Sequence, residues 1–238
     1  LKNLMRVARR RGKRVYVTFN TVIDEDNVEE AVRQLSELDA IRPSALIVQD
    51  LGIARLCRTY FPDLEIHAST QLVAHNLEGV LALKELGFAR VVLARELSVE
   101  EIASIVKRSG GLEFECFVHG ALCYSLSGLC LFGAMEKDRS GNRGKCPYCC
   151  RLPYEDEECR QTLALSMKDL RLGEDVRKLV NAGVCSLKIE GRMKSRLYVA
   201  SVTKYYRQIL GEGEGEGGDC GRKVTPADLE TVFSRRTT

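Results

Sequence analysis

The residues best suited to chemistry in this sequence are its ten cysteines, because a thiolate is both a nucleophile and a metal ligand. Soft sulfur ligands select zinc, copper(I) or iron-sulfur clusters. Cys123 and Cys130 lie seven positions apart, a group of three follows after sixteen more positions, and Cys185 stands alone further on. The group of three consists of Cys146, Cys149 and Cys150.

Spacing alone leaves three interpretations open: an iron-sulfur cluster, a zinc site, or reactive and incidental thiols. A structural zinc ribbon carries two Cys-x-x-Cys knuckles, and only residues 146–149 have that spacing. Four ligands from separated loops favour a [4Fe-4S] cluster, which needs four thiolates but no fixed short motif. Cys57 and Cys116 fall in apolar runs and are expected to be buried, while Cys159 and Cys220 lie in polar loops without a role.

Composition predicts a soluble, cytoplasmic protein of one large domain. Of the 238 residues, 45% are hydrophobic and 29% charged, which suffices for a large core. The net charge of +3 does not indicate a strong non-specific polyanion binder, although a local basic patch is compatible with it. No apolar run approaches the ~20 residues of a membrane span, and no secretory signal is visible, so we expect no membrane and reduced thiols.

Short β-branched runs alternate with amphipathic helical stretches, the pattern of βα units around a parallel sheet. The helix after Leu97 opens with a capping-box signature, Ser98 followed by Glu101. Six strands are predicted, at 15–20, 45–48, 65–68, 90–94, 114–118 and 186–189.

This pattern predicts an α/β fold, an incomplete (β/α) TIM-like barrel with six of its eight βα units visible. Residues 1–210 form the partial barrel, with a cysteine-rich insertion at 121–165 after the fifth strand. We expect two N-terminal strands to be missing, a flexible Gly/Glu linker at 211–222, and the start of a truncated C-terminal extension at 223–238. An open, doubly wound sheet of six strands is the alternative.

Polar residues recur where the predicted strands end, which in a β/α barrel is the rim that carries catalytic groups. Each of them also has a structural explanation, since any parallel strand ends in polar residues as it leaves the core. Two loops add cations that suit an anion: Ser140–Lys145, which contains Arg143, and Gly191–Lys194, which contains Arg192 and precedes a helix. The strand-end residues are Asn20, Asp50, Gln71, Arg95, Glu96, His119, Lys188 and Glu190.

Several long motifs resemble the collagenase-like peptidase family U32 across nearly the whole chain. Ser69–Gln71 and Val92–Ser98 agree with that family as well. The most specific matches are Phe117–Cys123, Ser127–Cys130, Asn142–Cys146, Cys150–Tyr154 and Leu187–Ser195.

The resemblance implies a choice between proteolysis and hydroxylation. Family members were named for collagen proteolysis, whereas others support oxygen-independent hydroxylation of tRNA uridine, an rRNA cytidine or a ubiquinone precursor. It also implies a [4Fe-4S] cluster on Cys123, Cys130, Cys146 and Cys185, with Cys150 in reserve. RNA is then the expected partner, and a protein substrate is the alternative.

A peptidase would need a nucleophile or an activated water, but the sequence has neither a His-Glu-x-x-His pair nor a Gly-x-Ser-x-Gly elbow. His119 would either pair with Cys123 as a dyad or order the cluster loop, and we favour the ordering role. The hydroxylation hypothesis assigns catalytic roles to His119, Glu96, Glu190 and Lys188. It assigns substrate binding to Arg95, Gln71, Asn20, Arg192 and Arg143. A third hypothesis is a non-catalytic, cluster-containing RNA-binding accessory protein.

Overall fold

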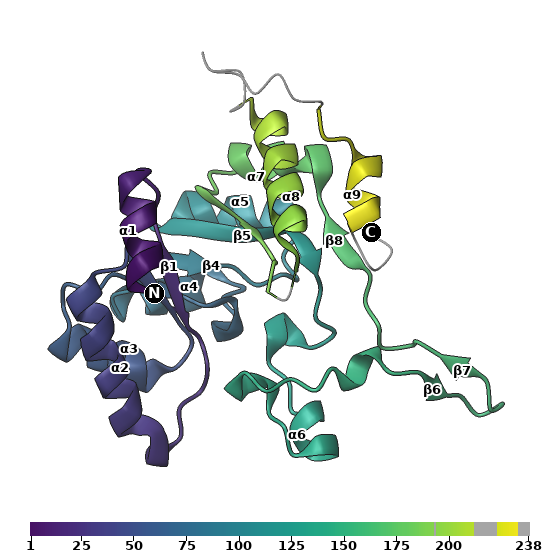
Figure 1. The fold of residues 1–238 in the computed structure, drawn as a ribbon, viewed down its shortest axis with the longest axis horizontal. Coiled ribbons are helices and arrows are strands. Elements are labelled where there is room, and N and C mark those ends of the chain that lie inside the picture. The colour runs from purple at the N-terminus through teal and green to yellow at the C-terminus, as the bar shows by residue number, and fades with distance from the viewer. Residues whose placement is uncertain (193, 212–222, 233–238) are drawn as a thin grey trace.

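The computed structural model describes residues 1–192, 194–211 and 223–232. Its centre is a curled sheet in which six parallel strands follow one another in chain order (Figure 1). All six predicted strands are confirmed, each to within a few residues. They are β1 (Tyr16–Phe19), β2 (Ala45–Val48), β3 (Ile66–Ala68), β4 (Arg90–Val92), β5 (Glu113–Ala121) and β9 (Ser186–Ile189).

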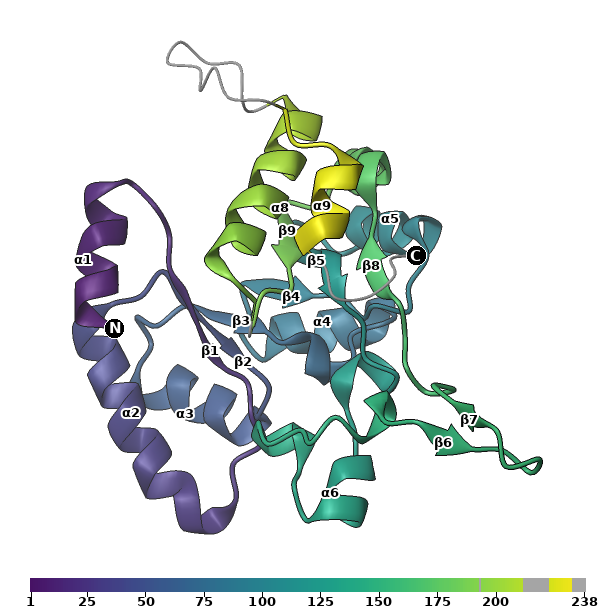
Figure 2. The same cartoon turned by 45° about the vertical axis from the view of Figure 1, so that its right-hand side comes forward.

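Helices connect these strands and pack on one face of the sheet, where their apolar stripes meet the outward side chains of the strands. The predicted capping box is present at the start of α5, where Ser98 and Glu101 exchange hydrogen bonds. Helix α9 lies beside α8 (Figure 2), with Leu229 fully buried. The helices are α1 (Lys2–Arg10), α2 (Val28–Ile41), α3 (Leu51–Tyr60), α4 (Leu77–Glu85), α5 (Val99–Arg108), α7 (Val176–Asn181), α8 (Arg196–Leu210) and α9 (Pro226–Val232).

The two faces of the sheet differ in chemistry. Along β5, Phe114, Cys116 and Val118 belong to the apolar core shared with the helices. Glu115 and Phe117 alternate with them and therefore face the concave side, which lacks that helix cover. The concave side thus carries polar and charged groups, as the interior of a barrel enzyme does near its active end.

The strand order argues against the doubly wound alternative, which requires the order to reverse at a switch point. Here the parallel strands run β1-β2-β3-β4-β5 and then β9 without reversal. A short strand that the sequence did not predict, β8 (Asp169–Arg171), pairs antiparallel with the end of β5. The observed fold is therefore α/β with a curled, open parallel sheet.

Between β5 and β8 the chain leaves the sheet and forms what we call the cysteine-rich segment, residues 122–168. It contains α6 (Phe132–Lys137) and the hairpin of β6 (Tyr154–Glu155) and β7 (Gln161–Thr162), which projects away from the rest of the molecule (Figure 1).

Within the described ranges, no helix has the length and apolar character needed to cross a membrane. The predicted linker at 211–222 lies, apart from Gly211, outside the described residues, as does Cys220.

Candidate functional site

A cleft of about 940 Å³ opens at the carboxyl ends of the strands, between the sheet and the cysteine-rich segment. Parallel strands end on the same edge, so residues distant in sequence meet there. Seven of the nine rim residues that the sequence predicted as catalytic or substrate-binding line this strand-end cleft. They are Asn20, Gln71, Arg95, Arg143, Lys188, Glu190 and Arg192.

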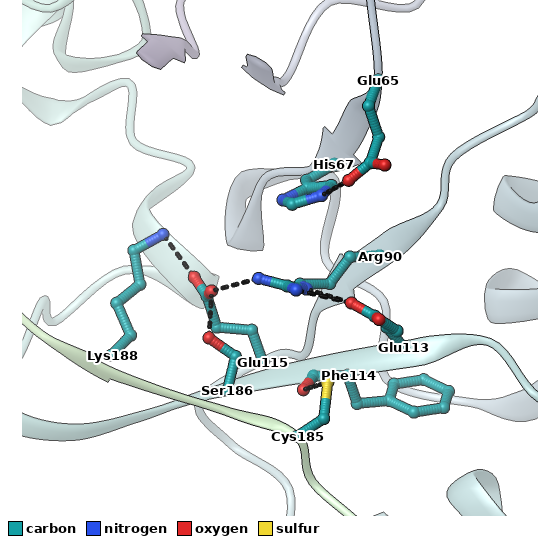
Figure 3. Close-up of polar contacts among 9 residues, drawn as sticks. All are labelled: Glu65, His67, Arg90, Glu113, Phe114, Glu115, Cys185, Ser186 and Lys188. Carbon is teal, nitrogen blue, oxygen red and sulfur yellow. Dashed lines mark hydrogen bonds and ion pairs between the residues drawn. The ribbon is translucent and has the colours of Figure 1, made fainter. Parts of the chain in front are cut away.

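Lys188 forms an ion pair with a buried carboxylate, Glu115. Its ammonium lies 2.8 Å from Oε1 of Glu115, whose side chain is only 5% exposed, and 5.3 Å from the centre of the Phe117 ring. Ser186 donates to the other Glu115 oxygen, and Arg90 approaches that oxygen at 3.6 Å (Figure 3). Although burial acts to raise it, Lys188 and these hydrogen bonds keep the pKa of Glu115 below its ordinary value.

Arg95 is a partly buried cation whose charge lacks a close partner. Its guanidinium stacks on the Phe117 ring at 4.0 Å, and Nη1 donates to the carbonyl of Ala121. No described carboxylate lies within 4 Å of it, and its Nε is buried without a hydrogen bond. Burial lowers the pKa of Arg95. A desolvated guanidinium is costly unless an anion pairs with it, so the cleft is suited to an anionic ligand.

Glu190 is brought to the cleft by a close approach of two chain segments. The backbone amide of Glu190 donates to the carbonyl of His119, and the carbonyl of Glu190 accepts from the hydroxyl of Tyr198. Gly120 has a φ of +111°, and a Cβ there would lie 2.7 Å from atoms of Glu190. Only glycine fits this position, which explains the glycine directly after His119 near the end of β5.

Two predicted catalytic residues do not line the cleft. Glu96 accepts hydrogen bonds from the amide and the hydroxyl of Ser127, at 2.7 and 2.6 Å, so it anchors the cysteine-rich segment to the sheet. His119 is 1% exposed and lies against the rings of Tyr198 and Tyr206. This placement favours an anchoring role for Glu96 over a catalytic one.

The surroundings of His119 make it a neutral imidazole. The Tyr206 hydroxyl donates to the carbonyl of Val118 and therefore accepts from Nδ1 of His119, at 3.1 Å. Burial, together with Arg171 and Lys194, lowers the pKa of His119 to about 4. A base of this kind is poorly suited to activate Cys123, and the contacts of the His119 side chain with Tyr198 and Tyr206 join β5 to α8.

Four thiols of the cysteine-rich segment gather beside the cleft, and we call them the cysteine group: Cys123, Cys130, Cys146 and Cys150. The Cβ atoms of Cys130 and Cys146 lie 3.9 and 3.7 Å from where a Cβ on Gly141 would stand, and Gly141 lines the cleft. Burial raises the pKa of Cys150, and the other three thiols raise it further because they are close enough to interact with its charge.

Cys185 lies apart from this group, although the family resemblance implied it as a ligand. Its thiol and its amide both donate to the carbonyl of Phe114, at 3.3 and 3.2 Å, near the beginning of β5 (Figure 3). Cys123 follows the other end of that strand, and the seven steps from Phe114 to Ala121 span about 23 Å at ~3.3 Å per residue. The reserve residue, Cys150, takes its place.

The described residues include no group of three or more His, Cys, Asp or Glu side chains that converge on one metal ion. All nine described cysteines are free thiols. The cysteine group is therefore a gathering of separate sulfurs rather than a ligand sphere around a single point.

Arg151 joins the two ends of the cysteine-rich segment. Its guanidinium donates to the carbonyl of Leu122 at the start of the segment, and to the hydroxyl of Ser166 and the carbonyl of Met167 at the end. Arg151 and Glu115 were not among the residues predicted for the site. Two features of the sequence could have identified them. Glu115 is a charged residue within the apolar run of the fifth strand, and Arg151 is a cation directly after Cys150.

Comparison with known proteins identifies the family. The model of peptidase family U32 matches residues 1–238. This chain belongs to peptidase family U32. It is 40% identical to the 23S rRNA 5-hydroxycytidine synthase of Escherichia coli, over 93% of this chain and 34% of that protein.

Two further U32 relatives are named for tRNA hydroxylation and for collagen cleavage. The chain is 37% identical to tRNA hydroxylation protein P1 of Bacillus subtilis, over 85% of this chain and 51% of that protein. It is 30% identical to a collagenase of Porphyromonas gingivalis, over 99% of this chain and 61% of that protein. The chain thus spans between a third and three fifths of the length of these relatives.

The buried position of Glu115 makes its loss costly. Replacing Glu115 by Gln leaves Lys188 without its counter-ion, and we expect the free energy of unfolding to fall by about 3 kcal/mol. Glu174 pairs with Arg177 where both side chains are more than half exposed, so Glu174→Gln should cost less than about 1 kcal/mol. Urea denaturation of both variants measures the difference, and equal losses would contradict it. Because the pKa of Glu115 is lowered, the stability lost in Glu115→Gln relative to the wild-type protein should be largest at neutral pH. It should shrink as the pH falls below the ordinary carboxyl range.

Arg151 should control the order of the cysteine-rich segment. We expect Arg151→Met to make residues 122–168 several times more sensitive to limited proteolysis, because both ends of the segment lose their shared donor. Arg160→Met is the matched control, since Arg160 is exposed and pairs only with nearby acidic residues of the hairpin. Cleavage sites mapped by mass spectrometry decide the matter, and identical cleavage of the two variants would disprove the role of Arg151.

Proposed function

We propose that this protein supports hydroxylation of a pyrimidine base in RNA, a tRNA uridine or an rRNA cytidine, and that it carries a [4Fe-4S] cluster. The observation that carries the proposal is a cleft with cations free of close carboxylates, bordered by the cysteine group. Two U32 relatives named above are RNA hydroxylation proteins. The strand-end residues of this chain supply binding groups for such a substrate.

The charge of the cleft suits a phosphodiester. Arg95, Lys145 and Arg192 line it, and no described carboxylate lies within 4 Å of their charged groups. Arginine binds phosphate oxygens in a fork of parallel hydrogen bonds, and such contacts position a nucleic acid without reading its sequence. Lys188, on β9, and Glu190, directly after it, line the same cleft, where they are available to hold or move a proton at the bound base.

The donor set of the cysteine group suits an iron-sulfur cluster, because a [4Fe-4S] cluster offers a separate iron to each of four thiolates. Zinc is the alternative, since four thiolates also bind a structural zinc ion. Cys123, Cys130, Cys146 and Cys150 would hold the cluster, and a bound cluster would supply one-electron chemistry at the cleft. Hydrogen bonds from Ser125 and from backbone amides, acting against burial, lower the pKa of Cys130, which favours its ligand form.

The same proposal includes a complete barrel. The parallel strands end at β1 on one edge and at β9 on the other, and a closed barrel of this class has eight strands. Two further strands would join these edges, and the cysteine-rich segment would then be an insertion after the fifth of the six parallel strands seen here. The concave charged face would become the barrel interior.

Metal content tests the ligand set. Anaerobically purified full-length protein should contain about four irons, and single Ser variants of Cys123, Cys130, Cys146 or Cys150 should lose most of this iron and its visible absorption. Cys185→Ser is the matched control and should keep both, since Cys185 lies at the other end of β5. Stoichiometric zinc without iron in the wild-type protein, or loss of iron in Cys185→Ser, would contradict the proposal.

RNA composition tests the substrate. Mass spectrometry of total tRNA and rRNA nucleosides from a deletion strain should show the loss of one hydroxylated pyrimidine. The wild-type gene should restore that nucleoside and Arg95→Met should not, because the cleft loses its buried cation. Arg55→Met, on the exposed side of α3, is the control and should restore it fully. An unchanged set of hydroxylated nucleosides in the deletion strain would remove the RNA hypothesis.

A further inference from the structure

Two side-chain amides in the wall of the cleft are joined to each other. Nδ2 of Asn20 donates to Oε1 of Gln71 at 3.1 Å, across 51 positions of sequence. Asn20 directly follows β1, and Gln71 lies in the 3₁₀ turn after β3. Both residues line the cleft and are half-buried. We call them the amide pair.

Neighbouring groups hold the amide pair in place. The backbone N–H of Gln71 donates to Oγ of Ser69 at 3.3 Å, which fixes the backbone of the turn. Gly128 of the cysteine-rich segment packs on the other side, where a Cβ would lie 3.5 Å from Cγ of Gln71. A ligand that binds the amides therefore orders little that is not already ordered.

The mutual bond leaves a defined set of groups for a ligand. A side-chain amide has two N–H donors and a carbonyl oxygen with two lone pairs. The bond uses one donor of Asn20 and one lone pair of Gln71, and neither side chain makes another hydrogen bond within the described part of the chain. The oxygen of Asn20 and the NH₂ group of Gln71 remain wholly unused, as an acceptor beside a donor, together with the second N–H of Asn20 and the second lone pair of Gln71.

An adjacent donor and acceptor is the pattern that a pyrimidine presents on its base-pairing edge. Cytosine offers an amino donor beside the N3 acceptor, and uracil offers a carbonyl acceptor beside the N3 donor. If both amides rotate by half a turn together, their mutual bond survives with its direction reversed, and the free donor and acceptor exchange places. One amide pair can therefore serve either pyrimidine.

Arg95 and Phe117 form a flat surface in the same cleft. The guanidinium of Arg95, after β4, is stacked on the ring of Phe117, and both line the cleft. Bases extruded from single-stranded RNA stack on arginine planes and aromatic rings while their edges are read by hydrogen bonds. The cleft thus combines a stacking surface with an edge reader.

We propose that the Asn20–Gln71 amide pair reads the base-pairing edge of a pyrimidine bound in the cleft. This inference rests on the proposed function and adds to it the residues that select the base. A purely structural tie between the two loops would use the same mutual bond, but it would make no difference to which base is bound.

The test compares oligonucleotides that share a backbone. Fluorescence anisotropy with the full-length protein measures binding of oligo(U), oligo(C) and an abasic RNA of equal length. We expect the wild-type protein to bind the two pyrimidine oligomers about tenfold more tightly than the abasic one. Gln71→Met should reduce that preference several-fold, because the methionine side chain fills the space without donor or acceptor, whereas the part that is due to stacking on Arg95 and Phe117 should remain. Arg192→Met should weaken all three equally, since it removes a phosphate contact.

A second variant tests the reader without changing its shape. Gln71→Glu keeps an acceptor for Asn20 but removes both donors, so Nδ2 of Asn20 must face the carboxylate and the paired rotation is lost. The cleft then presents one fixed hydrogen-bonding pattern, which should favour one pyrimidine over the other. The affinity ratio of oligo(C) to oligo(U) should change about fivefold or more, and the ratio cancels the uniform effect of the added charge. Retention of the wild-type base preference by both variants would overturn the inference, as would wild-type protein that does not distinguish pyrimidine from abasic RNA. Failure of every oligomer to bind would overturn the proposed function together with it.

Discussion

Strand β5 is the constraint on which the rest of the site depends. It is nine residues long and pairs with β4 and β9 in parallel and with β8 in antiparallel fashion. Its beginning carries the contacts of Cys185, its middle carries Glu115, and its end leads through Gly120 into the cysteine-rich segment. The length of this one strand separates thiols that sequence spacing alone left interchangeable.

The buried carboxylate in the middle of β5 links the interior of the sheet to the cleft. Glu115 lies between Arg90, which points into the concave side, and Lys188, which reaches the cleft. A buried charge without a partner is costly, so the three groups stabilise one arrangement of β4, β5 and β9. Arg95 stands apart from this network, with no described carboxylate within 4 Å of its guanidinium, and this contrast marks the cleft rather than the interior as the place for an anionic ligand.

Much of the fold could be predicted because the relevant signals are local. β-branched runs, apolar periodicity and the Ser98 capping box each depend on a few neighbouring residues, and all of them correspond to elements of the structure. β8 could not be predicted, since three residues that include Asp169 and Arg171 carry no strand signal and pair only because β5 extends beyond β9. Glu96 ends a predicted strand like its neighbours, but the turn at Ser127 folds back onto it and takes it out of the cleft.

The sequence by itself determined the alternation of strands and helices, the strand-end residues that meet at the cleft, and the family of the chain, because these depend on residue type and order. Only the tertiary structure decided which thiols are neighbours, which cations keep a free charge, and that Asn20 and Gln71 bond to each other. Those relations join residues tens of positions apart, and the curl of the sheet and the path of the cysteine-rich segment determine them. The cysteines show the difference most directly: ten thiols were visible in the sequence, and the fold replaced Cys185 by Cys150 in the group beside the cleft.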